Sequence, residues 1–208
     1  MALETERKYL EVDFANLRTV LAECGAKALG VHFESNCVFD THGEELFADG
    51  RLLRLRTQEW PDGKRFVLTL KLPAQQRGGF KTREEYELEI ADDKTMQDVL
   101  EGLGYSVRAR YEKIRETWQL QDVKIDLDIL PFIQAVELEG EADGILRVAA
   151  CLGLDKARQS VKNYYQLHQE WLRQHCLPPV CSFVFSEEQQ VFWRRKLGLT
   201  ATVASWGE

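Results

Sequence analysis

Like charges two residues apart recur along this chain. The acidic sets are Glu4/Glu6, Glu85/Glu87/Glu89, Asp126/Asp128 and Glu137/Glu139, and the basic ones are Arg54/Arg56 and Lys113/Arg115. Residues two apart on a β-strand leave the same face, about 6 to 7 Å from each other, so the acidic sets repel unless cations lie among them. Mg²⁺ binds carboxylate oxygens and substrate phosphates together, while Arg and Lys bind phosphate oxygens. The pattern therefore predicts a site for a divalent cation and a polyanion such as a triphosphate.

The alternative interpretation is that each charged face is the solvated side of an antiparallel sheet, which is the commoner explanation for any single strand. Solvated faces, however, ordinarily mix Thr, Ser and Gln with both signs of charge, whereas these faces are chemically uniform. We favour the site for a metal and phosphates because the same uniformity returns on strand after strand.

Composition limits the class of protein. The chain has 208 residues, 44% of them hydrophobic, which is enough apolar material for a folded core. The formal net charge of −7 argues against general nucleic-acid binding. Apolar runs are far shorter than the roughly 20 residues of a membrane-spanning helix, so we expect no membrane partner and a cytoplasmic location. The five cysteines show no CxxC spacing and are expected to be free thiols.

Charged and apolar residues alternate in seven to eight candidate strands. The clearest lie near residues 4–8, 52–56, 66–72, 83–90, 113–115, 125–129 and 136–139. If all the charged faces point inward, the strands must curl into a tunnel with helices packed on its apolar outer side. A lumen wide enough for a nucleotide needs about eight strands. The predicted fold class is thus α+β, an eight-stranded antiparallel tunnel with a charged interior.

Helical spacing of apolar residues separates the strands. Predicted helices follow Asp13 and end at Gly25, follow Asp92 or Asp93 and end at Gly104, follow Asp143 and end at Gly153, and span 160–175 and 186–197. In the last helix, Ser186 and Gln189 form a candidate capping box. We interpret the basic residues at the end of that helix as a solvated helix end.

The order of these motifs resembles a known family. Glu4-Thr5-Glu6-Arg7-Lys8 resembles the ExExK signature of CYTH domains, the triphosphate tunnel metalloenzymes. The later motifs follow in the family's order, as Phe39-Asp40-Thr41, Leu53-Arg54-Leu55-Arg56, Leu68-Thr69-Leu70-Lys71, Arg83-x-Glu85-x-Glu87, Lys113-x-Arg115, Leu127-Asp128 and Glu137-Leu138-Glu139. The resemblance covers residues 3 to 172 and is nearest to the class IV adenylate cyclases.

The resemblance implies roles for individual residues. Mg²⁺ or Mn²⁺ would be held by carboxylates drawn from Glu4, Glu6, Glu85, Glu87, Asp128, Glu137 and Glu139. The triphosphate would be gripped by Lys8, Arg54, Arg56, Lys71, Arg83, Lys113, Arg115 and Lys162. Catalytic roles fall to Glu137, Glu139 and Lys8.

The reaction depends on which oxygen attacks. Attack of a ribose 3′-hydroxyl on the α-phosphorus of ATP gives cyclic AMP and pyrophosphate, the reaction of the class IV cyclases. Attack of water on the γ-phosphorus releases phosphate, the reaction of an inorganic or organic triphosphatase. A polyphosphate or nucleotide sensor without turnover is the third alternative. Against thiamine triphosphate, the Trp that the family places two residues before Arg54 is Leu52 here.

The chain is divided by the same resemblance. Residues 1–175 are expected to form the tunnel domain, and residues 176–208 a C-terminal extension of unknown role. The family is compatible with a homodimer, but no sequence feature specifies its interface. Tyr164, Tyr165 and Trp171 are interpreted as packing over the tunnel wall.

Overall fold

The computed structural model describes residues 2–199, and it is an α+β fold built around one antiparallel sheet. Its strands are β1 (Ala2–Leu10), β2 (Lys27–Asp40), β3 (Leu52–Trp60), β4 (Gly63–Lys71), β5 (Gln75–Arg77), β6 (Phe80–Ile90), β7 (Ser106–Leu120), β8 (Val123–Ile129), β9 (Gln134–Glu139) and β10 (Arg158–Ser160). Its helices are α1 (Phe14–Glu23), α2 (Glu45–Ala48), α3 (Asp93–Gly102), α4 (Ala142–Cys151), the 3₁₀ turn η1 (Leu154–Lys156), α5 (Tyr164–Gln174) and α6 (Glu187–Lys196).

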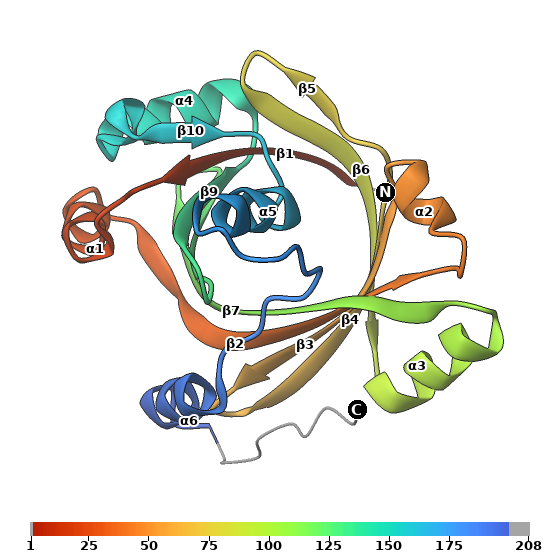
Figure 1. The fold of residues 1–208 in the computed structure, drawn as a ribbon. Helices are drawn as coiled ribbons and strands as arrows, with labels where there is room; N and C mark the ends of the chain where they lie inside the picture. Colours follow the sequence, from red (N-terminus) through yellow and green to blue (C-terminus); the bar gives the residue numbers. More distant parts are fainter. Residues whose placement is uncertain (1, 200–208) are drawn as a thin grey trace.

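Eight of the strands close into a barrel (Figure 1). Their order around it is β1-β9-β8-β7-β2-β3-β4-β6, and β6 pairs again with β1. The short strands β5 and β10 attach to β6 and β1 outside this ring. The predicted eight-stranded tunnel is confirmed, and the charged faces line its interior.

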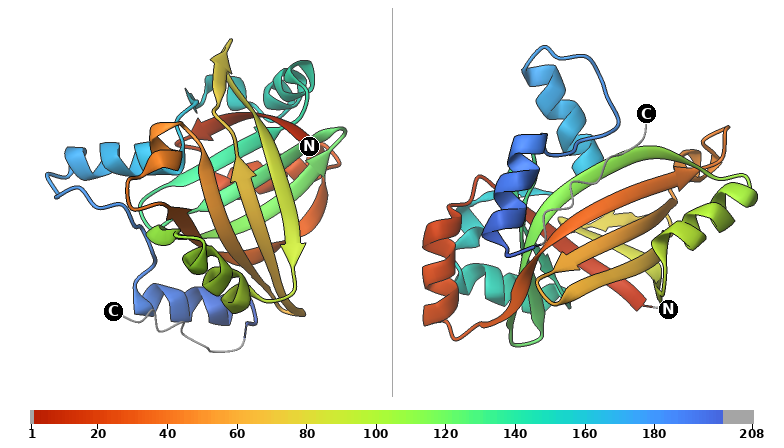
Figure 2. Two further views of the ribbon diagram at one scale, coloured as in Figure 1. Left: turned by 90° about the vertical axis from the view of Figure 1, so that its right-hand side faces the viewer. Right: turned by 90° about the horizontal axis from the view of Figure 1, so that it is seen from below.

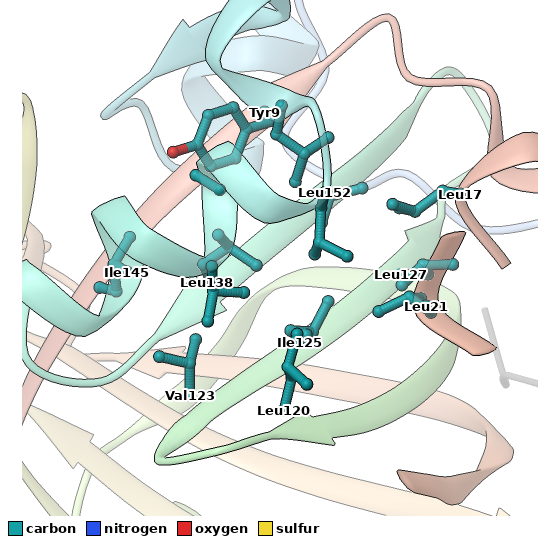
Figure 3. Packing of buried hydrophobic residues seen from close by; sticks show 14 of the residues in the cluster. Tyr9, Leu17, Leu21, Leu120, Val123, Ile125, Leu127, Leu138, Ile145 and Leu152 are labelled. Carbon is teal, nitrogen blue, oxygen red and sulfur yellow. The ribbon is translucent and has the colours of Figure 1, made fainter. Parts of the chain in front are cut away.

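Helices cover the apolar outer faces of the strands. Ile125 and Leu138 on β8 and β9 are fully buried against Ile145 of α4 and Leu21 of α1, as Figure 3 shows. Burying one such aliphatic side chain stabilises the fold by roughly 1.5 to 3 kcal/mol. The apolar core therefore lies outside the barrel wall, and the lumen is left to polar groups.

Local signals position most helices as predicted. The Asp13 side chain accepts from two backbone N–H groups of α1, and Asp92 caps α3 in the same way. Two predicted boundaries are wrong. Helix α4 begins at Ala142, so Asp143 lies in its first turn instead of before it. Helix α5 begins at Tyr164 instead of near Ser160, because residues 158–160 pair with β1.

The ends of the barrel differ. Figure 2 shows α5 and the loop after it projecting beyond one end of the barrel, near α2, while α6 lies against the outside of the wall. Within residues 2–199, no helix is long and apolar enough to cross a membrane.

Candidate functional site in the tunnel

A cavity of about 530 Å³ occupies the barrel and opens at the end near α2 and α5. Thirteen of the residues predicted for the site line it: Glu4, Glu6, Lys8, Arg54, Arg56, Lys71, Arg83, Glu85, Glu87, Lys113, Arg115, Glu137 and Glu139. Strand alternation brings them together, because each belongs to the inward face of its strand.

One wall of the cavity is rich in cations. It is formed by β3, β4 and β7, which carry Arg54, Arg56, Lys71, Lys113 and Arg115. The guanidinium of Arg54 donates to the Tyr111 hydroxyl at 2.9 Å and to Thr69 at 3.3 Å. Burial alone would raise the pKa of Tyr111, but the charges of Arg54 and Lys113 lower it. Such fixed, buried cations suit a multiply charged phosphate chain.

The other wall is rich in carboxylates. Strand β1 pairs with β9 so that Glu6 lies directly opposite Glu139 and Lys8 opposite Glu137, and β6 adds Glu85 from the other side of β1. Lys81 holds Glu6 at 2.8 Å. These acids and the cationic wall line the same cavity, and the two walls meet at the ion pairs of Lys71 with Glu4 and of Arg115 with Glu137.

Glu4 and Glu85 form a carboxyl pair on this wall. Burial and the hydrogen bond with Glu4 raise the pKa of Glu85 to about 7, despite the nearby charge of Lys71. Burial would also raise the pKa of Glu4, but its bond with Glu85 and the charges of Lys71 and Arg83 lower it. Near neutral pH the two carboxyl groups therefore share one proton. Once that proton leaves, one oxygen of each carboxylate is available to a cation at the same position.

Lys8, Glu137 and Arg115 are joined deep in the tunnel. Lys8 Nζ lies 2.6 Å from Glu137 Oε1, and Arg115 Nη2 lies 2.5 Å from Glu137 Oε2. Burial opposes the charged forms, yet the pKa of Glu137 is held well below its ordinary value by Lys8 and Arg115. Glu137 is thus a permanent anion that orients two cations.

Asp128 and Lys162 do not line the cavity. Asp128 lies on the inner face of β8 opposite Arg115 and is completely buried under lining side chains, where it accepts from Lys113 at 3.0 Å, from Arg115 at 2.7 Å and from the Tyr164 hydroxyl at 2.6 Å. Lys162 pairs with Glu170 of α5. Asp128 therefore orients the lumen cations in this structure instead of offering its oxygens to the cavity.

Glu87 also lies apart from the Glu4/Glu85 pair. Its carboxylate accepts from Arg56 at 2.9 Å and from the Thr69 hydroxyl at 2.9 Å, and Arg54 lies 3.6 Å away. Of the two acids on β6 that were predicted for the site, Glu85 thus belongs to the carboxylate wall and Glu87 to the cationic wall.

Several site residues were not predicted. Glu34 of β2 is completely buried and lies 3.4 Å from Lys113 and 3.7 Å from Arg56. Tyr111, Tyr164, Lys81 and Lys124 also line the cavity. Tyr164 packs against the cluster of Leu10, Ala135 and Leu167, as predicted, and in addition its ring lies under Lys8 and its hydroxyl donates to Asp128. The sequence does contain a pattern that indicates Glu34. Glu34, Asn36, Val38 and Asp40 are spaced two apart, as residues on one face of a strand are.

The carboxylates of the tunnel would bind Mg²⁺ or Mn²⁺ only together with other oxygen ligands. Among residues 2–199, no three His, Cys, Asp or Glu side chains are gathered closely enough to hold a metal by themselves. Mg²⁺, however, is commonly held by one or two carboxylates together with substrate phosphates. The all-oxygen wall and the proton-sharing pair of Glu4 and Glu85 fit that mode, with phosphate completing the coordination.

The mouth of the cavity has a different chemistry. Its lining includes the apolar side chains of Val38, Leu52 and Ala109, and three aromatic residues, Phe47, Tyr165 and Phe183. The strand register explains the change. Val38 of β2 pairs with Arg54 of β3 and with Ala109 of β7, and these three residues lie two positions along their strands from the level of Arg56 and Tyr111. The cavity therefore grades from a mouth in which apolar and aromatic side chains lie beside Arg51 and Arg108 to an interior lined by charged groups.

Comparison with known proteins agrees with this architecture. The model of the CYTH domain matches residues 2–173. The chain belongs to the CYTH domain family.

Individual relatives are distant. A protein of Methanocaldococcus jannaschii named "Putative adenylate cyclase" is 29% identical over 126 residues, which cover 61% of this chain and 69% of that protein. A solved structure of the same description from Vibrio parahaemolyticus superposes with a TM-score of 0.69 at 20% identity, covering 80% and 97% of the two chains. A Hippeastrum protein, whose structure is described as revealing a dominant triphosphatase activity, gives 0.61 at 18% identity, covering 86% and 98%.

These comparisons establish the family and the fold. The family acts on triphosphate substrates and includes proteins named as adenylate cyclases and one described as a triphosphatase. The structural likenesses lie below 25% identity and speak for the shared barrel alone.

Proposed function

We propose that this chain is a divalent-metal-dependent enzyme that acts on a nucleoside triphosphate in the tunnel, with ATP cyclised to cyclic AMP and pyrophosphate as the leading reaction. The observation that carries the proposal is the graded cavity, in which cationic and carboxylate walls meet behind a mouth with aromatic side chains.

The interior supports triphosphate binding. Arg54 and Arg56 on β3 and Lys113 on β7 lie on either side of β2, and each is fixed by a partner, Tyr111 for Arg54 and Glu34 for Arg56 and Lys113. A chain of three phosphates extends over several ångströms and carries up to four charges, so it needs such a row of cations. A single carboxylate ligand would contact only part of this row.

The mouth supports an organic group on the substrate. Inorganic triphosphate has no apolar part, and its binding gains nothing from Leu52, Phe47 or Tyr165. A nucleoside presents a planar base that stacks on aromatic rings. The name of the Methanocaldococcus jannaschii relative points to the same substrate class.

The chemistry follows from the positions of these residues. A divalent cation held by the Glu4 and Glu85 pair together with the substrate phosphates would neutralise phosphate oxygens and stabilise the charge that develops on the leaving pyrophosphate. Arg54, Arg56 and Lys113 share in that neutralisation. Glu137 is locked by two cations, so Glu139, whose side chain is 36% exposed and pairs with Lys124, is the better placed of the two predicted catalytic acids to accept the 3′-hydroxyl proton.

Triphosphatase activity is the second candidate. It is favoured by the activity described for the Hippeastrum structure, which shares this fold. It needs the same cationic wall but places water, in place of the ribose hydroxyl, in line with the terminal phosphorus.

The test is turnover of ATP and, separately, inorganic triphosphate with Mg²⁺ or Mn²⁺, following cyclic AMP, pyrophosphate and phosphate. Arg54→Gln is the site variant, and Arg147→Gln on the outer face of α4 is the matched control. Cyclic AMP and pyrophosphate in equal amounts, lost in Arg54→Gln only, are the expected result.

Phosphate from either substrate would instead assign the triphosphatase reaction. Tight binding of both substrates without turnover under either metal would contradict the enzyme and favour the sensor. The same rates for Arg54→Gln and the wild-type chain would place the reaction outside the tunnel.

A further inference from the structure

The C-terminal segment that follows the family match returns to the barrel and reaches its cavity. The match ends at residue 173, yet Cys181 and Phe183 line the cavity together with the inward residues of the strands. Figure 1 shows the segment between α5 and α6 crossing the barrel opening before α6 lies against β2 and β3.

The segment is held by backbone hydrogen bonds. Strand β8 pairs with β7 only from Ile114 to Leu120, and the edge of β7 before Ile114 is occupied by the C-terminal segment. Phe183 donates its N–H to the Arg110 carbonyl at 3.0 Å, and Glu112 donates to the Phe183 carbonyl at 3.1 Å. These two bonds fix the direction of the Phe183 side chain.

Helix α6 anchors the segment from outside the barrel. Arg194 is 3% exposed and makes two bonds to the Glu59 carboxylate of β3, at 2.9 and 2.5 Å. Gln190 donates to Glu112 at 3.1 Å, and Phe185 packs on Phe33. The predicted solvated helix end is therefore wrong for Arg194, because a buried bidentate ion pair takes that side chain.

Phe183 is the aromatic member of the mouth that this segment supplies. This residue is 7% exposed, and its ring stacks on Tyr111 with centroids 5.2 Å apart, meets the His168 ring at 4.9 Å and contacts Phe132 edge to face at 5.3 Å, so only a small part of it lines the cavity. Tyr165 of α5 and Phe47 of α2 form an edge contact at 6.2 Å, and Phe47 is 65% exposed. Three elements that are distant in sequence thus each place one aromatic ring at the same opening.

Polar groups complete the surroundings of these rings. Asn163, Gln166, Arg51 and Arg108 line the same part of the cavity. Amide and guanidinium groups next to aromatic rings are the groups that hold the edge of a base and the hydroxyls of a ribose. Deeper in the tunnel, Tyr111 contacts Arg54, so the aromatic mouth borders directly on the cationic wall.

We infer that Cys181 and Phe183 of the C-terminal segment are part of the substrate site, that α6 anchors them there from outside the barrel, and that Phe183, with Phe47 and Tyr165, binds the base of a nucleoside triphosphate. The inference rests on the proposed function, because it assumes that the tunnel binds the triphosphate itself. It adds that Phe183, a residue beyond the matched domain, contributes to the selectivity for a nucleotide over inorganic triphosphate.

The test measures dissociation constants of ATP and of inorganic triphosphate by titration calorimetry in EDTA, where no metal-dependent turnover consumes either ligand. The variants are Phe183→Ala, which removes the ring, and Arg194→Gln, which releases the anchor. The matched controls are Phe192→Ala and Arg195→Gln, exposed residues of the same helix. Phe183→Leu keeps an apolar side chain and replaces Phe183→Ala if that variant does not fold.

We expect Phe183→Ala and Arg194→Gln to weaken ATP binding about tenfold, as the loss of one stacking ring does, and to leave inorganic triphosphate within twofold. Both controls should bind both ligands like the wild-type chain. Equal weakening of both ligands, or unchanged ATP binding, would overturn the inference while the tunnel proposal stands. A wild-type chain that binds neither ligand would overturn the proposed function and this inference with it.

Discussion

Lys8 Nζ lies 2.6 Å from Glu137 Oε1, and the two residues are direct cross-strand partners on β1 and β9. The Lys8 side chain is 2% exposed, and the charges of Glu137 and Glu6 raise its pKa despite its burial. The cation is therefore permanent, and it is held at the boundary between the carboxylate wall and the interior of the tunnel.

Replacing Lys8 should remove this fixed charge. We expect Lys8→Gln to lower turnover by about a hundredfold or more, the usual effect of removing one charge-stabilising donor, and to lower the melting temperature. The control is Lys27→Gln at the exposed start of β2. Turnover of Lys8→Gln within twofold of the control would show that Lys8 has no part in the chemistry.

Glu34 should stabilise the cationic wall. Glu34→Gln leaves Lys113 and Arg56 without their shared buried carboxylate, and such a loss typically costs about 3 to 5 kcal/mol. Urea unfolding measures this cost, with Glu23→Gln on the exposed side of α1 as the control, expected within about 0.5 kcal/mol of wild type. A Glu34→Gln chain as stable as the control would mean that Lys113 and Arg56 need no such partner.

The attachment of α6 should depend on pH through Glu59. Burial alone would raise the pKa of Glu59, but hydrogen bonds from Arg194 and Lys64 lower it below the ordinary value of 4.5. A lowered pKa means that the stabilisation is present above pH 4.5 and is lost as the pH falls through the folded-state value. We expect Glu59→Gln to lower the unfolding free energy by about 2 kcal/mol at pH 7 and by much less at pH 3.

Urea unfolding of the wild-type chain and Glu59→Gln at both values of pH gives that difference. A difference that is the same at pH 3 as at pH 7 would contradict the assignment of the pH dependence to Glu59. Hydrogen exchange of the α6 amides in the wild-type chain should speed up over the same acid range.

Two thiols should form a disulfide on oxidation. Sγ of Cys24, at the end of α1, lies 3.0 Å from Sγ of Cys151, at the end of α4. Diamide would take one hydrogen from each thiol, become the hydrazine and leave a bond between α1 and α4. We expect two of the five thiols to disappear, the 24–151 peptide pair to appear in a mass spectrum, and the melting temperature to rise. Cys151→Ser should abolish the change, and pairing between other cysteines would contradict the prediction.

Much of the barrel is predictable because its inward faces are uniform in charge. Charged and apolar residues alternate around Arg54 and Arg56 and around Glu137 and Glu139, which predicts strands with a charged inner face. About eight such strands are enough to close a sheet into a barrel. Strand β2 lacked this signal, since its inner face mixes His32, Glu34 and Asn36. The side-chain role of Glu34 depends on which strands become its neighbours, and that information is not local.

The site was predicted less completely than the fold, for a related reason. A two-residue period shows which residues share a face, but not how far each lies along the tunnel. Register places Asp128 directly beside Arg115, which covers it, and separates Glu85 from Glu87. The part played by Phe183 depends on tertiary packing, because its segment lies beyond the last strand of the barrel and docks on β7 through backbone bonds.

The central claim is that a triphosphate binds between the two walls of the tunnel. A crystal structure with inorganic triphosphate and Mn²⁺, recorded at the manganese absorption edge, tests it most directly. The account predicts phosphate density against Arg54, Arg56 and Lys113, and an anomalous peak beside Glu4 and Glu85. Phosphate density outside the barrel, or an anomalous peak away from β1, β6 and β9, would contradict it.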